Sequence, residues 1–286
     1  MRTNLLAFCL LVALTPMASA QTVAKGSTLA EVFSTVESPT ALQQILSGGD
    51  RNEIVDDKNV WVVPTMASAP GQFGAYFKTK VAVCNPTDRS YTIFVTLYNA
   101  EGKVKQVSLP MSPNQTKYWD DFLAEAFGYS GAGAVQFDSA FAPPGASPLN
   151  RFFVTAEVYT HSPNGKYKTV VANGIQWDRD MINPPRRSYN IGISVNAAQR
   201  TNIGAFNASD TQANTIIAEV YDANGKKTET ITFNLPPNGW SQKAVTVPVT
   251  NGKVVWSNPL GAYMYAVTVD NQSNDGTLCA ASVFVP

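Results

Sequence analysis

An internal repeat constrains the fold of this chain more than any other feature. Residues 78–85 (KTKVAVCN) resemble residues 200–207 (RTNIGAFN), because each begins with a basic residue and a threonine and ends an alternating pattern with asparagine. Three further matches follow in the same order, namely residues 98–103 with 221–226, 109–114 with 235–239, and 154–159 with 265–270. Asn-Gly turns recur in unrelated strands, so convergent hairpins are the alternative explanation. The ordered matches predict two copies of one unit.

Each copy has the pattern of a β-sandwich, with short apolar runs separated by turn residues about every ten positions. In the second copy the expected strands are Ser188–Val195, Thr201–Phe206, Thr215–Tyr221, Lys227–Asn234, Ser241–Val247, Lys253–Trp256, Ala262–Val269 and Thr277–Val285. We therefore expect an all-β protein with antiparallel sandwiches at residues 60–176 and 188–286, joined by a stiff linker at 177–187.

Two helical segments are expected besides the strands, one within the first sandwich and one ahead of it. Asp120–Phe127 has apolar residues at helical spacing and is followed by Gly128, which predicts a short helix at one end of the first sandwich. Residues 21–59 contain Ser38-Pro39 ahead of an apolar run, a typical helix start. This segment is expected to be a short helical lead or a flexible tether.

The first twenty residues have the pattern of a signal peptide. Arg2 precedes the apolar run Leu5–Leu14, and Ala18-Ser19-Ala20 provides the small residues at a cleavage site. The run is too short to span a bilayer of about 30 Å, although an uncleaved anchor is the alternative. We expect a mature chain without a membrane span, beginning at Gln21, that is secreted, periplasmic or at the cell surface.

Charge and histidine content exclude several classes of function. Lys and Arg total 21, as do Asp and Glu, so no basic surface is expected for nucleic acid. The one histidine, His161, lies in an expected hairpin turn, and no Gly-x-Ser-x-Gly motif is present. We therefore expect a protein that is not an enzyme and has no catalytic residues, cofactor or metal ligands.

Two acidic groups could nevertheless carry chemistry. Asp120-Asp121 with Glu125 could form the carboxylate pair of a glycosidase, or could be acids at the start of a helix. The oxygen-rich stretches Asp222–Gly225 and Asp270–Asp275 could bind calcium, although Asp and Asn are also ordinary turn residues.

The tryptophans could form a sugar-stacking platform or fill the cores. They are Trp61, Trp119, Trp177, Trp240 and Trp256. Trp256 lies in an apolar strand and is expected in the core, whereas Trp240 follows a turn and could be exposed.

The second copy resembles bacterial exported proteins built from tandem immunoglobulin- or fibronectin-III-like sandwich repeats, mostly of unassigned function. The resemblance rests on Thr201–Asn207, Tyr221–Gly225, Leu235–Trp240 and Tyr265–Asn271. The first copy departs from it where Gln115-Thr116 replaces Gly-Trp. The resemblance implies two tandem immunoglobulin-like antiparallel β-sandwiches and provides no catalytic residues.

These features predict an exported, non-enzymatic binding or structural module, such as an adhesin-like cell-surface component. The alternative is a carbohydrate-binding module or a glycoside-active protein. Its partner would be a protein or glycan at the cell surface, and the sequence leaves the ligand and oligomeric state open. Loops on a rigid scaffold commonly carry contacts, so the candidate residues are Asn99, Gly102, Asn164, Gly165, Asp222, Asn224, Gly225, Asn271 and Asp275.

Two cysteines remain after signal removal. Cys84 matches the apolar Phe206, and Cys279 alternates with Ala281 and Val283, so both are expected to be buried as separate thiols. An oxidising compartment favours a disulfide, which would require Cα atoms within about 7 Å.

The signal assignment predicts the mature N-terminus. Mass spectrometry of the exported protein should find Gln21 first, and Ala20→Arg should block cleavage because the peptidase needs a small residue there. Ser19→Gln is the control and should leave cleavage intact. An exported chain that retains Met1 would contradict the assignment.

Overall fold

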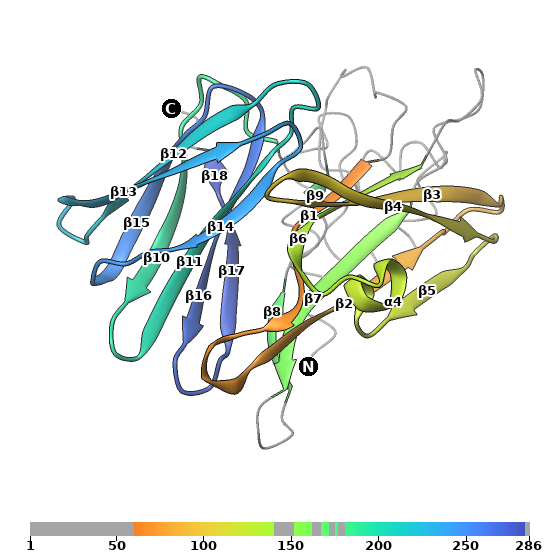
Figure 1. Cartoon of the computed structure of the whole chain (residues 1–286), viewed down its shortest axis with the longest axis horizontal. Helices are drawn as coiled ribbons and strands as arrows, with labels where there is room; N and C mark the ends of the chain where they lie inside the picture. The colour runs from red at the N-terminus through yellow and green to blue at the C-terminus, as the bar shows by residue number, and fades with distance from the viewer. Residues whose placement is uncertain (1–59, 140–151, 162–166, 172–174, 177–180, 284–286) are drawn as a thin grey trace, which may run out of the picture. The chain divides into compact units, whose positions relative to one another are not determined.

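The computed structural model describes residues 60–139, 152–161, 167–171, 175–176 and 181–283, which belong to one compact unit (Figure 1). About two thirds of them lie in antiparallel strands, as expected for an all-β protein. The expected signal peptide and helical lead lie outside these ranges. Among the residues described, no helix is long and apolar enough to cross a membrane.

The first half of the chain forms one nine-stranded sheet with a short helix. Its strands are β1 (Val60–Pro70), β2 (Tyr76–Cys84), β3 (Tyr91–Asn99), β4 (Gly102–Met111), β5 (Thr116–Trp119), β6 (Gly131–Ser139), β7 (Phe153–His161), β8 (Tyr167–Val171) and β9 (Ile175–Gln176). The order is β4-β3-β6-β1-β2-β7-β8, with β5 beside β2 and β9 beside β1. The helix α4 (Phe122–Phe127) lies where the sequence predicts one.

A single strand joins the two layers of this half, where two separate sheets were expected. Most of β1 pairs with β6, but its last residues, Ala69 and Pro70, pair with β2. The β1–β6 register shifts between Val63 and Met66. Such a bulge bends a strand and lets it pass from one layer to the other.

The second half forms two sheets around one core. Its strands are β10 (Ser188–Val195), β11 (Gln199–Asn207), β12 (Asn214–Tyr221), β13 (Lys227–Leu235), β14 (Trp240–Ala244), β15 (Val249–Ser257), β16 (Ala262–Asp270), β17 (Gly276–Ala280) and β18 (Ser282–Val283). The sheet orders are β13-β12-β15-β10-β18 and β14-β11-β16-β17. Trp256 is fully buried between them and donates to Asn190 Oδ1 at 2.7 Å, so its expected core position is confirmed. Ile182, in the expected linker, is also buried and pairs with Ala262.

The two halves pair their strands in corresponding order. The series β4-β3-β6-β1 matches β13-β12-β15-β10, and the series β5-β2-β7-β8 matches β14-β11-β16-β17. The asparagine that ends each repeated motif is fully buried. Each amide NH2 donates to two loop carbonyls at 2.7–2.8 Å, those of Arg89 and Ser112 for Asn85, and those of Gln212 and Pro236 for Asn207. The asparagine at the end of each motif thus holds two loops together through the hydrogen bonds of its amide group.

An apolar contact joins the two halves. Phe206 on β11 lies 5.3 Å from the Tyr98 ring on β3, and Trp240 donates its indole N–H to the carbonyl of Pro64 at 2.7 Å. Trp240 is only 8% exposed, so of the two positions left open for it the structure shows the buried one. The cluster comprises Val62, Tyr98, Ala134, Phe206, Ala208, Trp240 and Tyr263. Tyr265, fully buried on the same side of β16, packs with the core of the first half.

The cysteines are unbonded, as expected, but they are not both buried. Cys84 is half-buried because it lies on the outer side of β2, opposite Thr116 and Phe153. Cys279 is exposed because β17 ends its sheet. The alternation near Cys279 correctly predicted that its side chain is on the same side of the sheet as the buried Ala266. It could not predict that β17 is an edge strand, where that side is exposed.

Gly204 provides a test of this contact. A Cβ at Gly204 would overlap the buried ring of Tyr265, so Gly204→Ala should lower the free energy of unfolding by about 1–3 kcal/mol through overpacking. Ala82, which occupies the matching position on β2, provides the control, and Ala82→Ser should change stability by less than about 0.5 kcal/mol. Urea denaturation measures both. Equal effects would contradict the interface as described.

Candidate functional site

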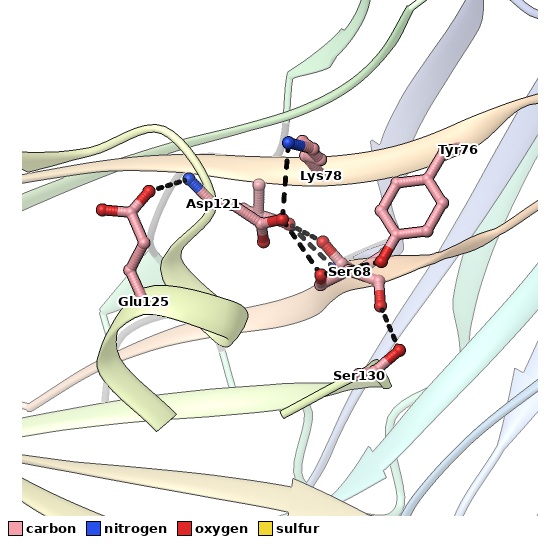
Figure 2. A network of polar contacts seen from close by, with 8 residues as sticks. Ser68, Tyr76, Lys78, Asp121, Glu125 and Ser130 are labelled. Carbon is pink, nitrogen blue, oxygen red and sulfur yellow. Dashed lines mark hydrogen bonds and ion pairs between the residues drawn. The ribbon is translucent and has the colours of Figure 1, made fainter. Parts of the chain in front are cut away.

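A polar hollow of about 390 Å³ lies between β1, β2 and α4 (Figure 2). Its lining carries a carboxylate, an ammonium group and four hydroxyls, on Asp121, Lys78, Ser68, Ser130, Tyr76 and Tyr129. Such a mixture of donors and acceptors can bind a polar ligand.

The helix α4 holds Asp121 at this hollow. Phe122, Leu123 and Phe127 are buried in the core of the first half, which fixes the helix over the sheet. Gly128 ends the helix with a φ of 61°, a left-handed conformation that glycine adopts without steric cost. The apolar spacing that predicted the helix therefore also sets the position of the carboxylate.

Asp121 is the more buried of the two charged groups of the hollow, with 8% of its surface exposed. Its Oδ2 accepts a hydrogen bond from Ser68 Oγ at 3.0 Å and lies 3.9 Å from Lys78 Nζ. The Tyr76 hydroxyl lies 3.4 Å from Ser68 Oγ. Asp121 Oδ1 is buried and has no hydrogen-bond partner. The site thus holds a carboxylate whose hydrogen-bonding capacity is only partly used.

The other two acids of the expected glycosidase cluster have local roles. Glu125 Oε1 accepts a hydrogen bond from the backbone N–H of Asp121 at 2.7 Å, and Figure 2 shows Glu125 on the opposite side of Asp121 from Ser68 and Tyr76. Asp120 Oδ1 accepts a hydrogen bond from the Tyr118 hydroxyl at 3.2 Å. Of the three acids, the structure brings only Asp121 to the hollow.

A second hollow, of about 240 Å³, lies on the outer side of β5, β2 and β7. Ala82 faces Tyr118 on one side and Thr155 on the other, and Lys80 faces Glu157. Alternation along β2 places Lys78 and Tyr76 on the same side. We call this surface the β5–β2–β7 face; it comprises Tyr76, Lys78, Lys80, Ala82, Tyr118, Phe153, Thr155 and Glu157.

Exposed aromatic residues mark the β5–β2–β7 face. Tyr118 is 59% exposed, Phe153 52% and Tyr76 41%. The tryptophans are elsewhere: Trp61 and Trp119 are half-buried against the first core, Trp240 and Trp256 are buried, and Trp177 lies outside the described residues. Sequence reasoning looked for a platform among the tryptophans and missed the outward positions of β2, β5 and β7, which the alternation in these strands could have indicated.

The matching face of the second half is covered. Phe206 there faces Trp240 and Tyr263, and Gly204 faces Tyr265. These side chains pack against the first half. Corresponding strands therefore present an apolar, buried face in one half and a polar, exposed face in the other.

The hairpin turns expected to bind a partner differ in their surroundings. At Gly102 a Cβ would lie 3.0 Å from the carbonyl oxygen of Pro237, so the turn from Asn99 to Gly102 lies against the second half. The turn from Asp222 to Gly225 is held by Asp222 Oδ1, which accepts the backbone N–H groups of Asn224 and Lys226 at 2.9 Å. Asn164 and Gly165 lie outside the described residues, and His161 is the last residue of β7 and not part of a turn.

An arginine fills one of the turns considered for calcium. The Arg200 guanidinium donates to Asn271 Oδ1 at 3.0 Å and to Asn274 Oδ1 at 2.9 Å, and partial burial lowers its pKa. Asp275 accepts a hydrogen bond from Ser273 Oγ at 3.0 Å. Within the described ranges, no group of three or more His, Cys, Asp or Glu residues could hold a metal ion.

The chain matches no known protein family, and a search of curated proteins finds no significant match.

Ser68 is the test of the Asp121 environment. Ser68→Ala removes the hydroxyl that donates to a nearly buried carboxylate, so the free energy of unfolding should fall by about 1–3 kcal/mol. Ser130, whose hydroxyl makes only a 3.3 Å contact with the Ser68 carbonyl, is the control. Ser130→Ala should change the free energy by less than about 0.5 kcal/mol in the same urea titration. A loss as large as that of Ser68→Ala would contradict the assigned contact.

Proposed function

We propose that the protein is an exported, non-enzymatic binding module of two tandem immunoglobulin-like sandwiches, with an adhesin-like role at the cell surface. The observation that carries this proposal is the β5–β2–β7 face, which carries the second hollow and three exposed aromatic residues and shares Tyr76 and Lys78 with the first hollow. The binding surface is the sheet face, and the hairpin tips are secondary.

Three features support the tandem arrangement. The strand orders of the two halves correspond, and no sheet among the described strands mixes the two halves. Asn85 and Asn207 make equivalent hydrogen bonds to loop carbonyls. The repeated motifs of the sequence fall on corresponding strands, β2 with β11 and β7 with β16, but strand pairing shifts the second match by one residue, so that Tyr265 corresponds to Thr155 and not to Val154.

The apolar contact between the halves favours binding. It buries aromatic side chains of β11 and β16 against the first half and restrains the scaffold that carries the face. A restrained surface loses less conformational entropy when a ligand binds. This supports a binding role in which the face changes little when the ligand binds.

The chemistry of the first hollow supports a non-enzymatic role. Glycoside hydrolysis uses two carboxyl groups about 5–9.5 Å apart on either side of the scissile bond. Here Glu125 accepts a hydrogen bond from the backbone of its own helix, so Asp121 faces the hollow without it. Ser68 donates directly to a carboxylate, with no histidine between them as a base would require.

Export is supported by the secretory pattern before Gln21. It places the module in the periplasm, at the surface or outside the cell. A face that binds a cell-surface partner has access to that partner in these compartments.

The test is binding of the fluorescently labelled, exported protein to intact cells of the producing organism, measured by flow cytometry. Ala82→Arg fills the second hollow and should abolish the bound signal. Ile191, which is 75% exposed on β10, is the matched control, and Ile191→Arg should leave the signal unchanged. Absence of binding, or equal binding by both variants, would contradict the proposal.

A further inference from the structure

We propose that the β5–β2–β7 face binds a neutral oligosaccharide chain, with Tyr118 stacking on a sugar ring. This inference rests on the proposed binding function and specifies its ligand. It draws on the charge balance of the face, the placement of its aromatic side chains and its contrast with the covered face of the second half.

With Asp121 of the first hollow included, the two lysines of the face are balanced by two carboxylates. Lys80 faces Glu157 across the β2–β7 pair, and Lys78 lies 3.9 Å from the Asp121 carboxylate. An ionic ligand of either sign therefore gains no net attraction. A sugar hydroxyl can donate to a carboxylate and accept from an ammonium group at the same time, so neighbouring hydroxyls suit such pairs.

The buried carboxylate gives the first hollow a specific acceptor. Asp121 accepts one hydrogen bond from Ser68, and its Oδ1 has no partner. Because Oδ1 is closed to solvent, a ligand donor can approach Asp121 only where its side chain lines the hollow, beside Ser68 and Lys78. The hydroxyl of a sugar supplies a donor without bringing a charge into the hollow.

The aromatic side chains are placed for an extended ligand. Tyr118 on β5 is opposite Ala82 and Phe153 on β7 is opposite Cys84, so they lie about 12 Å apart, two strand spacings across the sheet and two residues along it. The Tyr118 hydroxyl donates to Asp120 Oδ1, which holds the ring while 59% of its surface stays exposed. The apolar face of a pyranose ring can cover such an aromatic ring, and this spacing suits a chain of sugars better than a single ring.

The two hollows form a track along β2. Lys78 lines the first hollow, whereas Lys80 and Ala82 line the second. Residues two apart in a strand are about 7 Å apart, so the hollows adjoin. Ala82 and Thr155 are small and leave room between Tyr118 and the Lys80–Glu157 pair. A linear oligosaccharide fits this geometry.

The covered face of β11, β14 and β16 shows which side chains this strand arrangement carries where it packs against protein. In the second half, Phe206 stands where Cys84 stands in the first, and Tyr265 and Val267 stand where Thr155 and Glu157 stand. That face packs against protein and is apolar. The polar, hydroxyl-bearing counterpart is therefore assigned to a hydrated ligand and not to a second copy of the chain.

The test is calorimetric titration of the exported protein with cellohexaose, xylohexaose, mannohexaose and chitohexaose, and with a galacturonic acid hexasaccharide for comparison. At least one neutral chain should bind. Tyr118→Ala should weaken that binding at least about tenfold, whereas Tyr118→Phe should preserve it because the ring remains. Ile191→Ala, a change at an exposed site on β10, should have no effect.

Four results would overturn the inference: no neutral chain binds, only the acidic chain binds, Tyr118→Ala binds as tightly as the parent, or sedimentation shows a dimer that Tyr118→Ala abolishes. Cell binding lost in Ala82→Arg, together with no binding of any neutral chain, would reject the sugar and keep the proposed binding function. Absence of both would reject both.

Discussion

The outer face of β11, β14 and β16 carries aromatic and branched side chains that water would solvate poorly, and the first half of the chain covers them. Burial of this face is non-directional, but the indole of Trp240 adds a directed hydrogen bond to the carbonyl of Pro64. Together they set how the halves meet. Gly204 is part of the same constraint, since only a residue without a side chain leaves room for the Tyr265 ring.

The same contact determines which surfaces remain for function. In each half, a sheet with corresponding strand order has one side toward its own core, and its other side is either covered or open. In the second half, the outer side of β11, β14 and β16 is covered by the first half. In the first half, the corresponding outer side, the β5–β2–β7 face, is exposed. The binding proposal and the ligand inference both begin from this asymmetry.

Local features were predictable from the sequence, and long-range ones were not. Each expected strand of the second half overlaps an observed one, and the helix after Asp121 was expected, because turn residues and apolar spacing act locally. The sequence repeat also identified Asn85 and Asn207, but not the hydrogen bonds by which they hold two loops in place. Trp240 is buried by residues of the first half, and β1 pairs with strands of both layers. Both features depend on contacts between residues far apart in the sequence, and hydrophobic periodicity carries no information about such contacts. The exposure of Cys279 depends on strand order for the same reason.

The indole of Trp240 makes the contact between the halves optically visible. Its ring lies in an apolar environment and its N–H is bonded to the other half, whereas Trp256 sits inside the second core. Parting of the halves would hydrate the first indole and leave the second dry. Any parting of the halves that leaves the second core folded would therefore shift the emission of Trp240 to longer wavelength and leave that of Trp256 unchanged.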